Sequence, residues 1–357
     1  MSSRTRSPVS TTATRVRVRT PVPRRLWEEV LAADVEAMPT QSPAWIDCLC
    51  ATGRFRDATR MYEMPDGSVA VLPLVRAVGA TAHSMPQSWG YGGLISAPGP
   101  PDALLATAVL HDLASVAARI HLRPNPIQAQ AWSIGSADSG ATVVPARAHI
   151  LDLGGGFETV WRSRFKSSVR REVRRAEEGG VIIGTDSTGA FVPIFYELLR
   201  RSFDRWAARQ GEPGWLGRMR GRRRDPLSKF QIIADVLEDR CQISLACYRG
   251  RPIAAILVLR GGAVAHYTRG AMDTSIEVPV KVNSLLHKTA IEYACRDGCL
   301  RYHMGDSGFS AGLAQFKTRF GAQQHDFAEY WLERLPVFRA QRAVREAVKS
   351  AIGFRDA

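Results

Sequence analysis

One order of secondary-structure elements is expected twice along this chain of 357 residues. In the first half, helical spacing of apolar residues predicts a helix over residues 25–37. Ser42 suits the cap of a second short helix, with Pro43 at its first position. Alternating apolar residues and a Pro-Asp-Gly turn then predict a meander, a further helix and two closing strands. The strands are expected at residues 57–63, 68–78, 81–86, 127–132 and 149–153, and the helix at 102–120.

The second half shows the same order. Helices are predicted over residues 157–178 and 191–208, then a three-strand meander, a helix and a strand, at 242–248, 252–260, 263–270, 283–296 and 300–304. A pattern that repeats without clear identity favours two tandem α/β domains of one fold. The predicted domains span residues 14–153 and 154–335. A disordered tail is expected over residues 1–13, and a helical tail over 336–357.

Charge is the one unusual feature of the composition. The chain has 48 Lys and Arg against 34 Asp and Glu, a formal net charge of +14. Such a balance favours a polyanionic partner, namely nucleic acid, an anionic membrane face or a phosphorylated substrate, unless the charge is spread evenly. The cysteine spacings fit no zinc motif, so reduced thiols and no metal are expected. No apolar run reaches the roughly 20 residues that span a bilayer, and no secretory signal is found, so a cytoplasmic protein is expected.

The positive charge is clustered. Seven Lys and Arg lie between residues 162 and 175, and five arginines lie between 218 and 224. On a helix, Lys166, Arg170 and Arg174 would form one stripe opposite the apolar face. The alternative is an ordinary solvated helix face, but few acidic residues balance these bases. A phosphate-rich partner is favoured, and the candidate nucleic-acid-binding residues are Lys166, Arg170, Arg171, Arg174 and Arg175.

Three segments near the C-terminus have the character of a site. Residues 269–273 (RGAMD) precede a helix for which Asn283 suits the N-cap. Residues 301–306 (RYHMGD) form a strand that ends at Asp306. Residues 312–321 (GLAQFKTRFG) form a short helix that places Lys317 between two aromatic rings and ends on glycine. The plain alternatives are that Asp306 caps a turn and that Lys317 and Arg319 face solvent.

These segments, in this order, resemble a known family. The motif W…FKSS.RR..RRAE..GV is similar to the opening of the second domain of the FemABX peptidyltransferases and the related BioF2-like acetyltransferases, which are GNAT-like. HYTRGAMD…NSLLHKTAIEYACRDGC.RYHMGDS and GLAQFKTRFGA resemble the end of that domain. WGYGG near residue 90 and HLRPNP at residues 121–126 resemble elements of the first domain. The resemblance covers about residues 16–334.

The resemblance implies two tandem GNAT-like domains with a cleft between them. It also implies transfer of an amino acid from aminoacyl-tRNA to an amine of a peptidoglycan precursor or a small-molecule natural product, without a cofactor. The sequence departs from the pattern of this family in two features. Residues 209–229 show no heptads, so the coiled-coil insertion of some members is missing. Residues 273–282 contain no glycine, so the acyl-CoA phosphate loop of ordinary GNATs is missing, which argues against acetyl-CoA in the second domain.

The resemblance also implies roles for single residues. Lys317 would stabilise the oxyanion and Phe316 would stack on the terminal adenine of the tRNA. Asp306 would orient the attacking amine or act as its base. The predicted substrate-binding residues are Phe316, Tyr267, Arg269 and Asn283. Two other functions stay open: an acyl-CoA-dependent N-acyltransferase that uses acetyl-CoA or another acyl-CoA, and a non-catalytic RNA-binding module.

Overall fold

The computed structural model describes residues 16–77, 81–275, 280–308, 310–338 and 340–344. The tail predicted over residues 1–13 lies outside them. Of the helical tail predicted over residues 336–357, residues 336–338 and 340–344 are described, and 337–338 and 340–344 are helical. Among the described helices, none is long and apolar enough to cross a membrane.

The largest element of the described structure is one sheet of eleven strands. Its strand order is β10-β11-β12-β13-β14-β9-β15-β8-β6-β5-β2. The strands of the second half are β10 (Val181–Asp186), β11 (Cys241–Tyr248), β12 (Arg251–Gly261), β13 (Val264–Met272), β14 (Arg301–Asp306) and β15 (Gln323–Glu333). Those of the first half are β2 (Phe55–Asp57), β5 (Val75–Ala77), β6 (Thr81–Ser84), β8 (Arg119–Leu122) and β9 (Thr142–Asp152).

A smaller sheet of four strands covers part of the first half. Its order is β1-β3-β4-β7, and all its pairs are antiparallel. Its strands are β1 (Arg17–Arg19), β3 (Arg60–Glu63), β4 (Val69–Leu72) and β7 (Ile95–Ala97).

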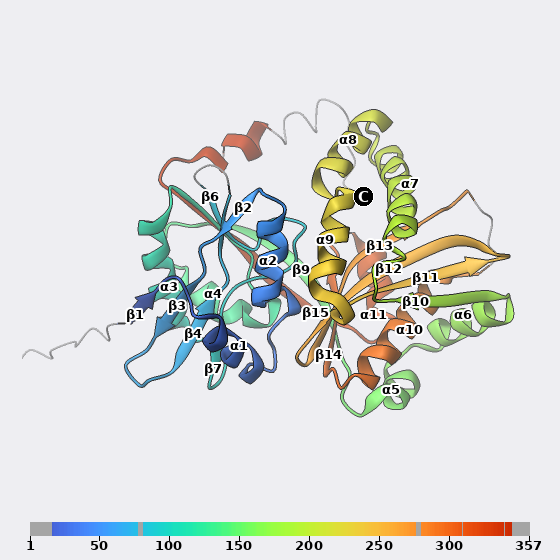
Figure 1. The fold of residues 1–357 in the computed structure, drawn as a ribbon, viewed down its shortest axis with the longest axis horizontal. Helices are drawn as coiled ribbons and strands as arrows, with labels where there is room; N and C mark the ends of the chain where they lie inside the picture. The colour runs from blue at the N-terminus through green and yellow to red at the C-terminus, as the bar shows by residue number, and fades with distance from the viewer. Residues whose placement is uncertain (1–15, 78–80, 276–279, 309, 339, 345–357) are drawn as a thin grey trace, which may run out of the picture.

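Helices cover the sheets in both halves (Figure 1). The first half has α1 (Arg24–Ala33), η1 (Pro39–Gln41), α2 (Pro43–Ala51), α3 (Ala103–Val116), η2 (Pro126–Gln128) and α4 (Ala129–Gly135). The second half has α5 (Gly156–Thr159), η3 (Val160–Arg164), α6 (Ser167–Glu178), α7 (Val192–Gln210), α8 (Gly214–Arg224), α9 (Leu227–Leu237), η4 (Glu238–Arg240), α10 (Val282–Arg296) and α11 (Ala311–Thr318).

The repeat predicted from the sequence is confirmed in the topology. In the second half, β11, β12 and β13 form an antiparallel meander, and α10 leads from β13 to β14, which pairs parallel to β13. In the first half, α3 leads in the same way from β6 to β8, which is parallel to β6. A parallel pair needs such a crossover, and the two crossovers define the same α/β unit twice.

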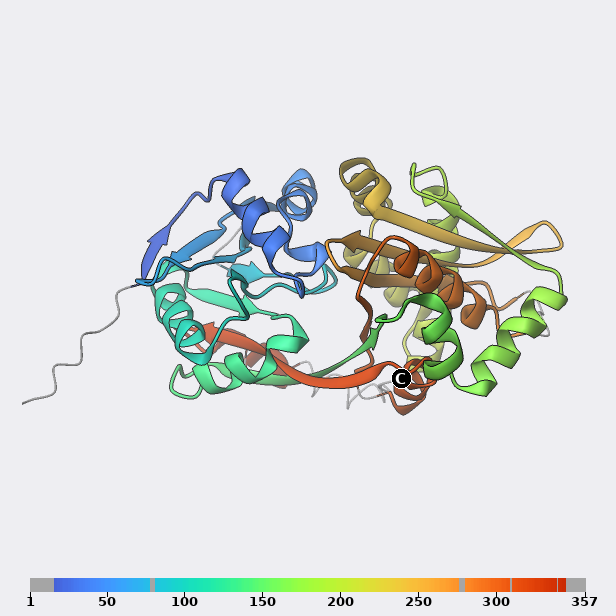
Figure 2. The same ribbon diagram turned by 90° about the horizontal axis from the view of Figure 1, so that it is seen from below.

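Two strands join the halves. β9 and β15 pair over nine residues, from Gln323 with Ile150 to Trp331 with Thr142. β9 also pairs with β14, and β15 pairs with β8. Figure 2 shows both strands running from one half into the other. Because the hydrogen bonding is continuous, strand order alone does not divide the chain at residues 153–154, and the domain boundary stays a prediction.

Packing also crosses between the halves. One core cluster joins Trp45 and Cys48 of α2 with Phe230 and Ile233 of α9. A second core lies beneath α6 and α10, and a third lies beneath α3. The start of α2 is as expected, because Ser42 Oγ accepts from the Trp45 amide and Pro43 occupies the first position.

Several predicted elements differ from the structure. The strands expected at 57–63 and 68–78 each divide in two, into β2 and β3 and into β4 and β5, and the two parts of each lie in different sheets. The strand expected at residues 127–132 is the helical turn η2 followed by α4, because the Asn125 side chain caps the turn and Pro126 fixes its first residue. The single helix expected over residues 157–178 breaks at Phe165 and Lys166, whose extended backbone separates η3 from α6.

Two glycines fix how α8 packs on α7. A Cβ at Gly217 would lie 2.5 Å from the Ala207 Cβ, and one at Gly221 would lie 2.6 Å from the Phe203 ring. Both distances are far below van der Waals contact, so only glycine allows the two helices this approach.

We expect Gly221→Ala to lower the free energy of unfolding by about 1–3 kcal/mol, because the added methyl overpacks the contact with Phe203. The matched control is Gly312→Ala in α11, where nothing lies within 4 Å of the added Cβ. That change should leave stability unaltered or raise it by up to ~1 kcal/mol, since alanine favours a helix. Denaturant unfolding measures both, and equal stability of the two variants would contradict the close packing of α8.

Candidate functional site

A pocket of about 530 Å³ lies where α10 begins. Its walls come from α6, β12, β13, α10 and α11. Two of the predicted substrate-binding residues, Asn283 and Phe316, line it. The full lining is Glu172, Ile253, Ala254, Met272, Asp273, Thr274, Val280, Lys281, Val282, Asn283, Ser284, Phe316 and Arg319.

The start of helix α10 lies at this pocket. α10 begins at Val282 with Lys281 as its N-cap, and the Lys281 side chain makes no capping bond. The N-cap role predicted for Asn283 is therefore wrong, because the Ser284 amide already donates to the Lys281 carbonyl (3.1 Å) and starts the helix before Asn283. Uncapped amides and the helix dipole favour a negatively charged ligand at this point.

An ion pair forms one wall of the pocket. Glu172 of α6 accepts from Arg319 (2.6 Å) and from the Ser284 hydroxyl (2.6 Å). Burial raises the pKa of Glu172, but these hydrogen bonds outweigh it and the net shift is downward, so the group stays a carboxylate. Arg319 therefore does not simply face solvent, because it holds Glu172 and lines the pocket.

Lys317 is not among the residues that line the pocket. Its side chain is 2% exposed, and Nζ donates to the carbonyls of Gly305 (2.8 Å) and Asp306 (2.5 Å). Burial lowers its pKa from 10.5 to about 7. The alternative of a solvent-facing Lys317 is wrong. The ammonium holds the end of β14, while the preceding residue, Phe316, reaches the pocket.

Asp306 is held by residues of the first half. Its carboxylate accepts from the Tyr91 hydroxyl and from the Arg123 guanidinium, and the side chain is still 32% exposed. Arg123 also pairs with Glu329 of β15 (3.6 Å), and Glu329 contacts His121 Nε2 (2.9 Å). Tyr91 and Arg123 stand in the WGYGG and HLRPNP segments, but sequence reasoning did not select them as site residues.

Two buried histidines lie beside Tyr91, whose hydroxyl bonds this carboxylate. His266 and His303 have ring centroids 5.2 Å apart, and the Tyr91 ring lies 4.5 Å from that of His303. Burial lowers the pKa of both, that of His266 to about 3, so they are neutral. The Gly305 amide donates to His303 Nδ1 (3.1 Å), which leaves the proton of the neutral ring on Nε2.

Arg269 and Tyr267 do not line the pocket. Arg269 donates to the buried carboxylate of Asp225 (3.2 and 3.3 Å), which also pairs with Lys229 (2.9 Å) and Arg224 (2.8 Å). These cations hold the pKa of Asp225 below its usual range against the opposing effect of burial. Tyr267 packs against the ring of His287, and burial raises its pKa to about 12.

The predicted basic stripe is altered by the break before α6. Lys166 stands at the N-cap, and Arg170 turns back to donate to the carbonyls of Trp161, Arg162 and Phe165. Within the described part of the chain, no ion pair is found for the other four predicted residues, which are all exposed. These four residues are called the α6 basic face: Lys166, Arg171, Arg174 and Arg175.

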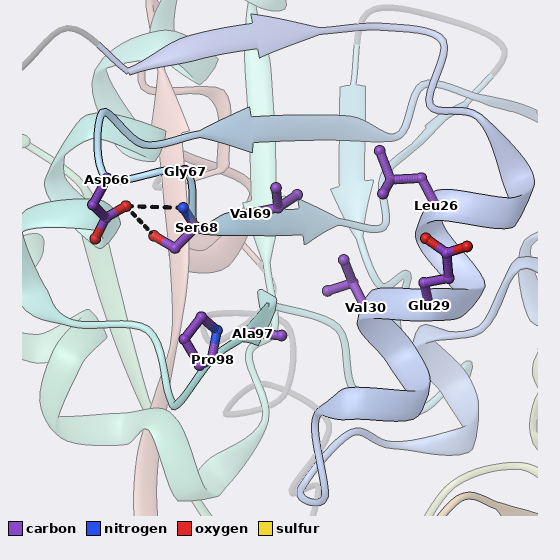
Figure 3. Close-up of a pocket in the computed structure, with 9 residues that line it drawn as sticks. All are labelled: Leu26, Glu29, Val30, Asp66, Gly67, Ser68, Val69, Ala97 and Pro98. Carbon is purple, nitrogen blue, oxygen red and sulfur yellow. Dashed lines mark hydrogen bonds between the residues drawn. The ribbon is translucent and has the colours of Figure 1, made fainter.

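A second pocket, of about 400 Å³, lies on the first half between α1 and the turn from β3 to β4 (Figure 3). Its two acidic groups already have partners. Asp66 accepts from the amide (2.9 Å) and hydroxyl (2.6 Å) of Ser68, and Glu29 pairs with Arg25 (2.9 Å). None of the predicted site residues lines it, so the pocket at α10 is the candidate site.

Comparison with known proteins supports the predicted fold. Residues 163–334, which include the pocket, match the acetyltransferase (GNAT) domain family. No curated protein sequence matches the chain. Among solved structures, the crystal structure of FemX has a TM-score of 0.65 and 13% identity, covering 91% of this chain and 99% of that one. The chain has the tandem GNAT fold of FemX.

Two further solved structures share the tandem GNAT fold. The C-terminal domain of a putative lysylphosphatidylglycerol synthetase from Agrobacterium fabrum has a TM-score of 0.50 and 11% identity, covering 93% of this chain and 97% of that one. A tandem GNAT protein from the clavulanic acid biosynthesis pathway has a TM-score of 0.50 and 14% identity, covering 90% and 99%. The tandem GNAT-like fold predicted from the sequence is thereby confirmed, and the likeness to FemX agrees with the FemABX resemblance seen in the sequence.

Lys317→Met should lower the free energy of unfolding by about 1–3 kcal/mol, because two buried carbonyls lose their donor. The pKa of Lys317 falls from 10.5 to about 7 on folding, so the unfolded chain binds more protons between these values. The unfolding free energy of the wild type should therefore rise with pH across this window.

Denaturant unfolding at about pH 7 and about pH 9 measures this contribution, which Lys317→Met should lack. The matched control is Lys166→Met, because Lys166 is exposed. It should keep both the wild-type stability and its pH dependence. A Lys317→Met protein with the full wild-type rise would show that this lysine is not the titrating group.

Proposed function

We propose that this chain is an aminoacyltransferase that moves an amino acid from aminoacyl-tRNA to an amine acceptor and forms an amide bond. One observation carries the proposal: Phe316, at an anion-attracting helix start, and Lys317, beside Asp306, are neighbours on α11. The donor would enter the pocket at α10, and the acceptor would meet the exposed edge of Asp306. The acceptor class is a peptidoglycan precursor or a small-molecule natural product.

The chemistry asks little of the protein, because an aminoacyl ester is already activated. The acceptor nitrogen attacks the ester carbonyl, the C–N bond forms, and the C–O bond to the tRNA 3′ end breaks. The proton lost by the nitrogen passes to the Asp306 carboxylate and then to the departing 3′ oxygen. Tyr91 and Arg123 hold the Asp306 carboxylate in place, and by this they help to align the amine that it accepts the proton from.

Lys317 fits the remaining task of stabilising the oxyanion. An ammonium has three donors, and two of them are used by the Gly305 and Asp306 carbonyls. Those two bonds hold the group rigidly, which lowers the cost of reorganisation in the transition state. The Phe316 ring, at the pocket, supports stacking on the terminal adenine.

An acyl-CoA-dependent N-acyltransferase is the second candidate. It is favoured by the match to the acetyltransferase (GNAT) domain family and by the helix start at the pocket, which suits a pyrophosphate. The glycine-free segment over residues 273–282 counts against it.

The donor is tested by offering the protein an amine pool with either labelled aminoacyl-tRNA or labelled acetyl-CoA. We expect amide product from aminoacyl-tRNA alone. Asp306→Asn should reduce the rate by about 10²–10⁴-fold, because it removes the base. Phe316→Ala should instead weaken tRNA binding by about 1–3 kcal/mol through lost stacking. Leu313→Ala, an exposed change on the same helix, should leave both unchanged.

The three functions give different results in this assay. Transfer from acetyl-CoA alone would replace the proposal by the acyl-CoA alternative. No transfer from either donor, with tRNA still bound, would indicate the non-catalytic RNA-binding module.

The α6 basic face provides a separate test of tRNA binding. Affinity for tRNA should fall with salt, with a log–log slope of about −0.7 to −0.9 for each phosphate contacted. The double variant Arg171→Gln with Arg174→Gln should flatten that slope by about two contacts.

The control removes the same charge from the first half, where Arg54 and Arg56 are also exposed. Arg54→Gln with Arg56→Gln should leave the slope as in the wild type. If both double variants flatten the slope equally, net charge rather than the α6 basic face attracts the tRNA.

A further inference from the structure

Helix α8 lies at the edge of the second half (Figure 1), and two of its large apolar side chains are exposed. Its buried side consists of Gly217 and Gly221, which lie against Ala207 and Phe203 of α7. With 3.6 residues per turn, this contact turns the side of Trp215 and Met219 outward. Trp215 is 63% exposed and Met219 is 57% exposed. A helix whose small residues face the core and whose large ones face water is unusual for a folded protein.

Trp215 stands out among the tryptophans of the chain. All eight lie in the described part, and the other seven are buried or half-buried. Met219 is one turn further along the same side of the helix. Two neighbouring large apolar side chains on an outward face call for a partner that removes them from water.

Arginines border these two apolar residues. α8 contains five arginines and no acidic residue. Arg218 pairs with Asp204 (2.6 Å) and Arg220 with Glu212 (2.6 Å), which commits them to the protein. Arg222 and Arg223 lie on either side of the apolar pair, are exposed, and form no ion pair with a described residue. The outward face is therefore apolar at its centre and positively charged at its rim.

We infer that the outward face of α8, formed by Trp215, Met219, Arg222 and Arg223, docks on an anionic lipid surface. Tryptophan prefers the boundary between headgroups and acyl chains, and methionine adds apolar area beside it. Arginines at the rim are attracted by anionic headgroups. The helix would lie flat in the interface and would not span the bilayer. This face is separate from the pocket at α10, so the inference does not depend on the proposed reaction.

RNA is the competing partner, because arginines also bind phosphates and tryptophan stacks on bases. The composition of the face favours lipid. Single-stranded RNA uses aromatic rings between cations, and Met219 offers no ring for stacking. The α6 basic face shows the other arrangement, with exposed cations and no large apolar side chain among them. A lipid surface would bury the apolar side chains at the centre of α8, whereas a phosphate backbone would leave them in water.

The test is binding of the full chain to vesicles. Phosphatidylglycerol mixed with phosphatidylcholine should bind the protein in co-sedimentation, and phosphatidylcholine alone should bind it at least tenfold less. Brominated acyl chains should quench part of the tryptophan fluorescence on binding, because Trp215 enters the interface. Trp215→Ser with Met219→Ser should lose that quenching and reduce vesicle binding at least tenfold. Arg222→Gln with Arg223→Gln should reduce binding and its dependence on salt.

Matched variants control for charge and for exposed apolar area. Arg171→Gln with Arg174→Gln removes two exposed arginines from α6, and Ile182→Ser removes an exposed apolar side chain from β10. Both should keep wild-type vesicle binding. All variants should keep the wild-type melting temperature, since the changed side chains are exposed. The inference is overturned if anionic vesicles do not bind the wild type, or if the α8 variants bind vesicles normally and lose tRNA instead.

Discussion

The pairing of β15 with β9 and β8 is the interaction on which the arrangement of the site depends. β15 is the last strand of the large sheet in sequence, yet it lies in the middle of that sheet, between β9 and β8. By that pairing it carries Glu329 to Arg123, which otherwise has only Asp306 as an acidic partner among the described residues. Glu329, which follows α11 in the chain, thus helps to hold the arginine that bonds Asp306. Loss of this strand would remove the strand pairing that links β9 to β8 and one acidic partner of Arg123.

Buried polar groups around Asp306 are costly unless they are bonded, and most of them are. Tyr91 and Arg123 donate to the Asp306 carboxylate, and Lys317 donates to the backbone carbonyl of Asp306. A few atoms have no partner among the described residues, including Arg123 Nε, His266 Nδ1 and His303 Nε2. Arg123 bonds the Asp306 carboxylate, and both histidine rings pack against Tyr91, which also bonds it. Such incomplete pairing is expected where a polar substrate or water is to be bound, since a purely structural core would have closed it.

The elements of the repeat followed from periodicity, because apolar spacing reports directly which face of an element is buried. Helix starts were less certain. Asn283 is a good capping residue, but the chain before it already bonds as a helix from Lys281 onward. Residues 127–132 alternate like a strand, and only the cap at Asn125 shows that they turn into a helix. Propensity is a local quantity, and these outcomes were decided by hydrogen bonds to neighbouring residues.

Some of the site residues could also be placed from the sequence, and others could not. Asn283 and Phe316 could be placed together because both belong to segments whose order resembles one family. The burial of Lys317 could not be predicted, because a lysine between two phenylalanines is equally consistent with a solvent-facing side chain. The pairing of Arg269 with Asp225 could not be predicted either, because the two residues are 44 positions apart in the chain. Contacts between distant segments depend on tertiary structure, and a single sequence contains no direct signal of them.

The net charge of +14 does not by itself indicate which partners the protein binds. Several of its arginines are used internally: Arg123 on Asp306, Arg170 on backbone carbonyls, Arg269 on Asp225 and Arg319 on Glu172. Two helices, α6 and α8, carry neighbouring exposed cations that form no ion pair with a described residue, and the surroundings of these cations differ. α6 carries Glu172 into the pocket wall, so its exposed cations flank the candidate site and suit a long polyanion that enters there. α8 has large apolar residues between its cations, and a ligand that is only charged would leave these residues in water. The two faces therefore differ in chemistry as well as position, and one polyanionic partner does not account for both.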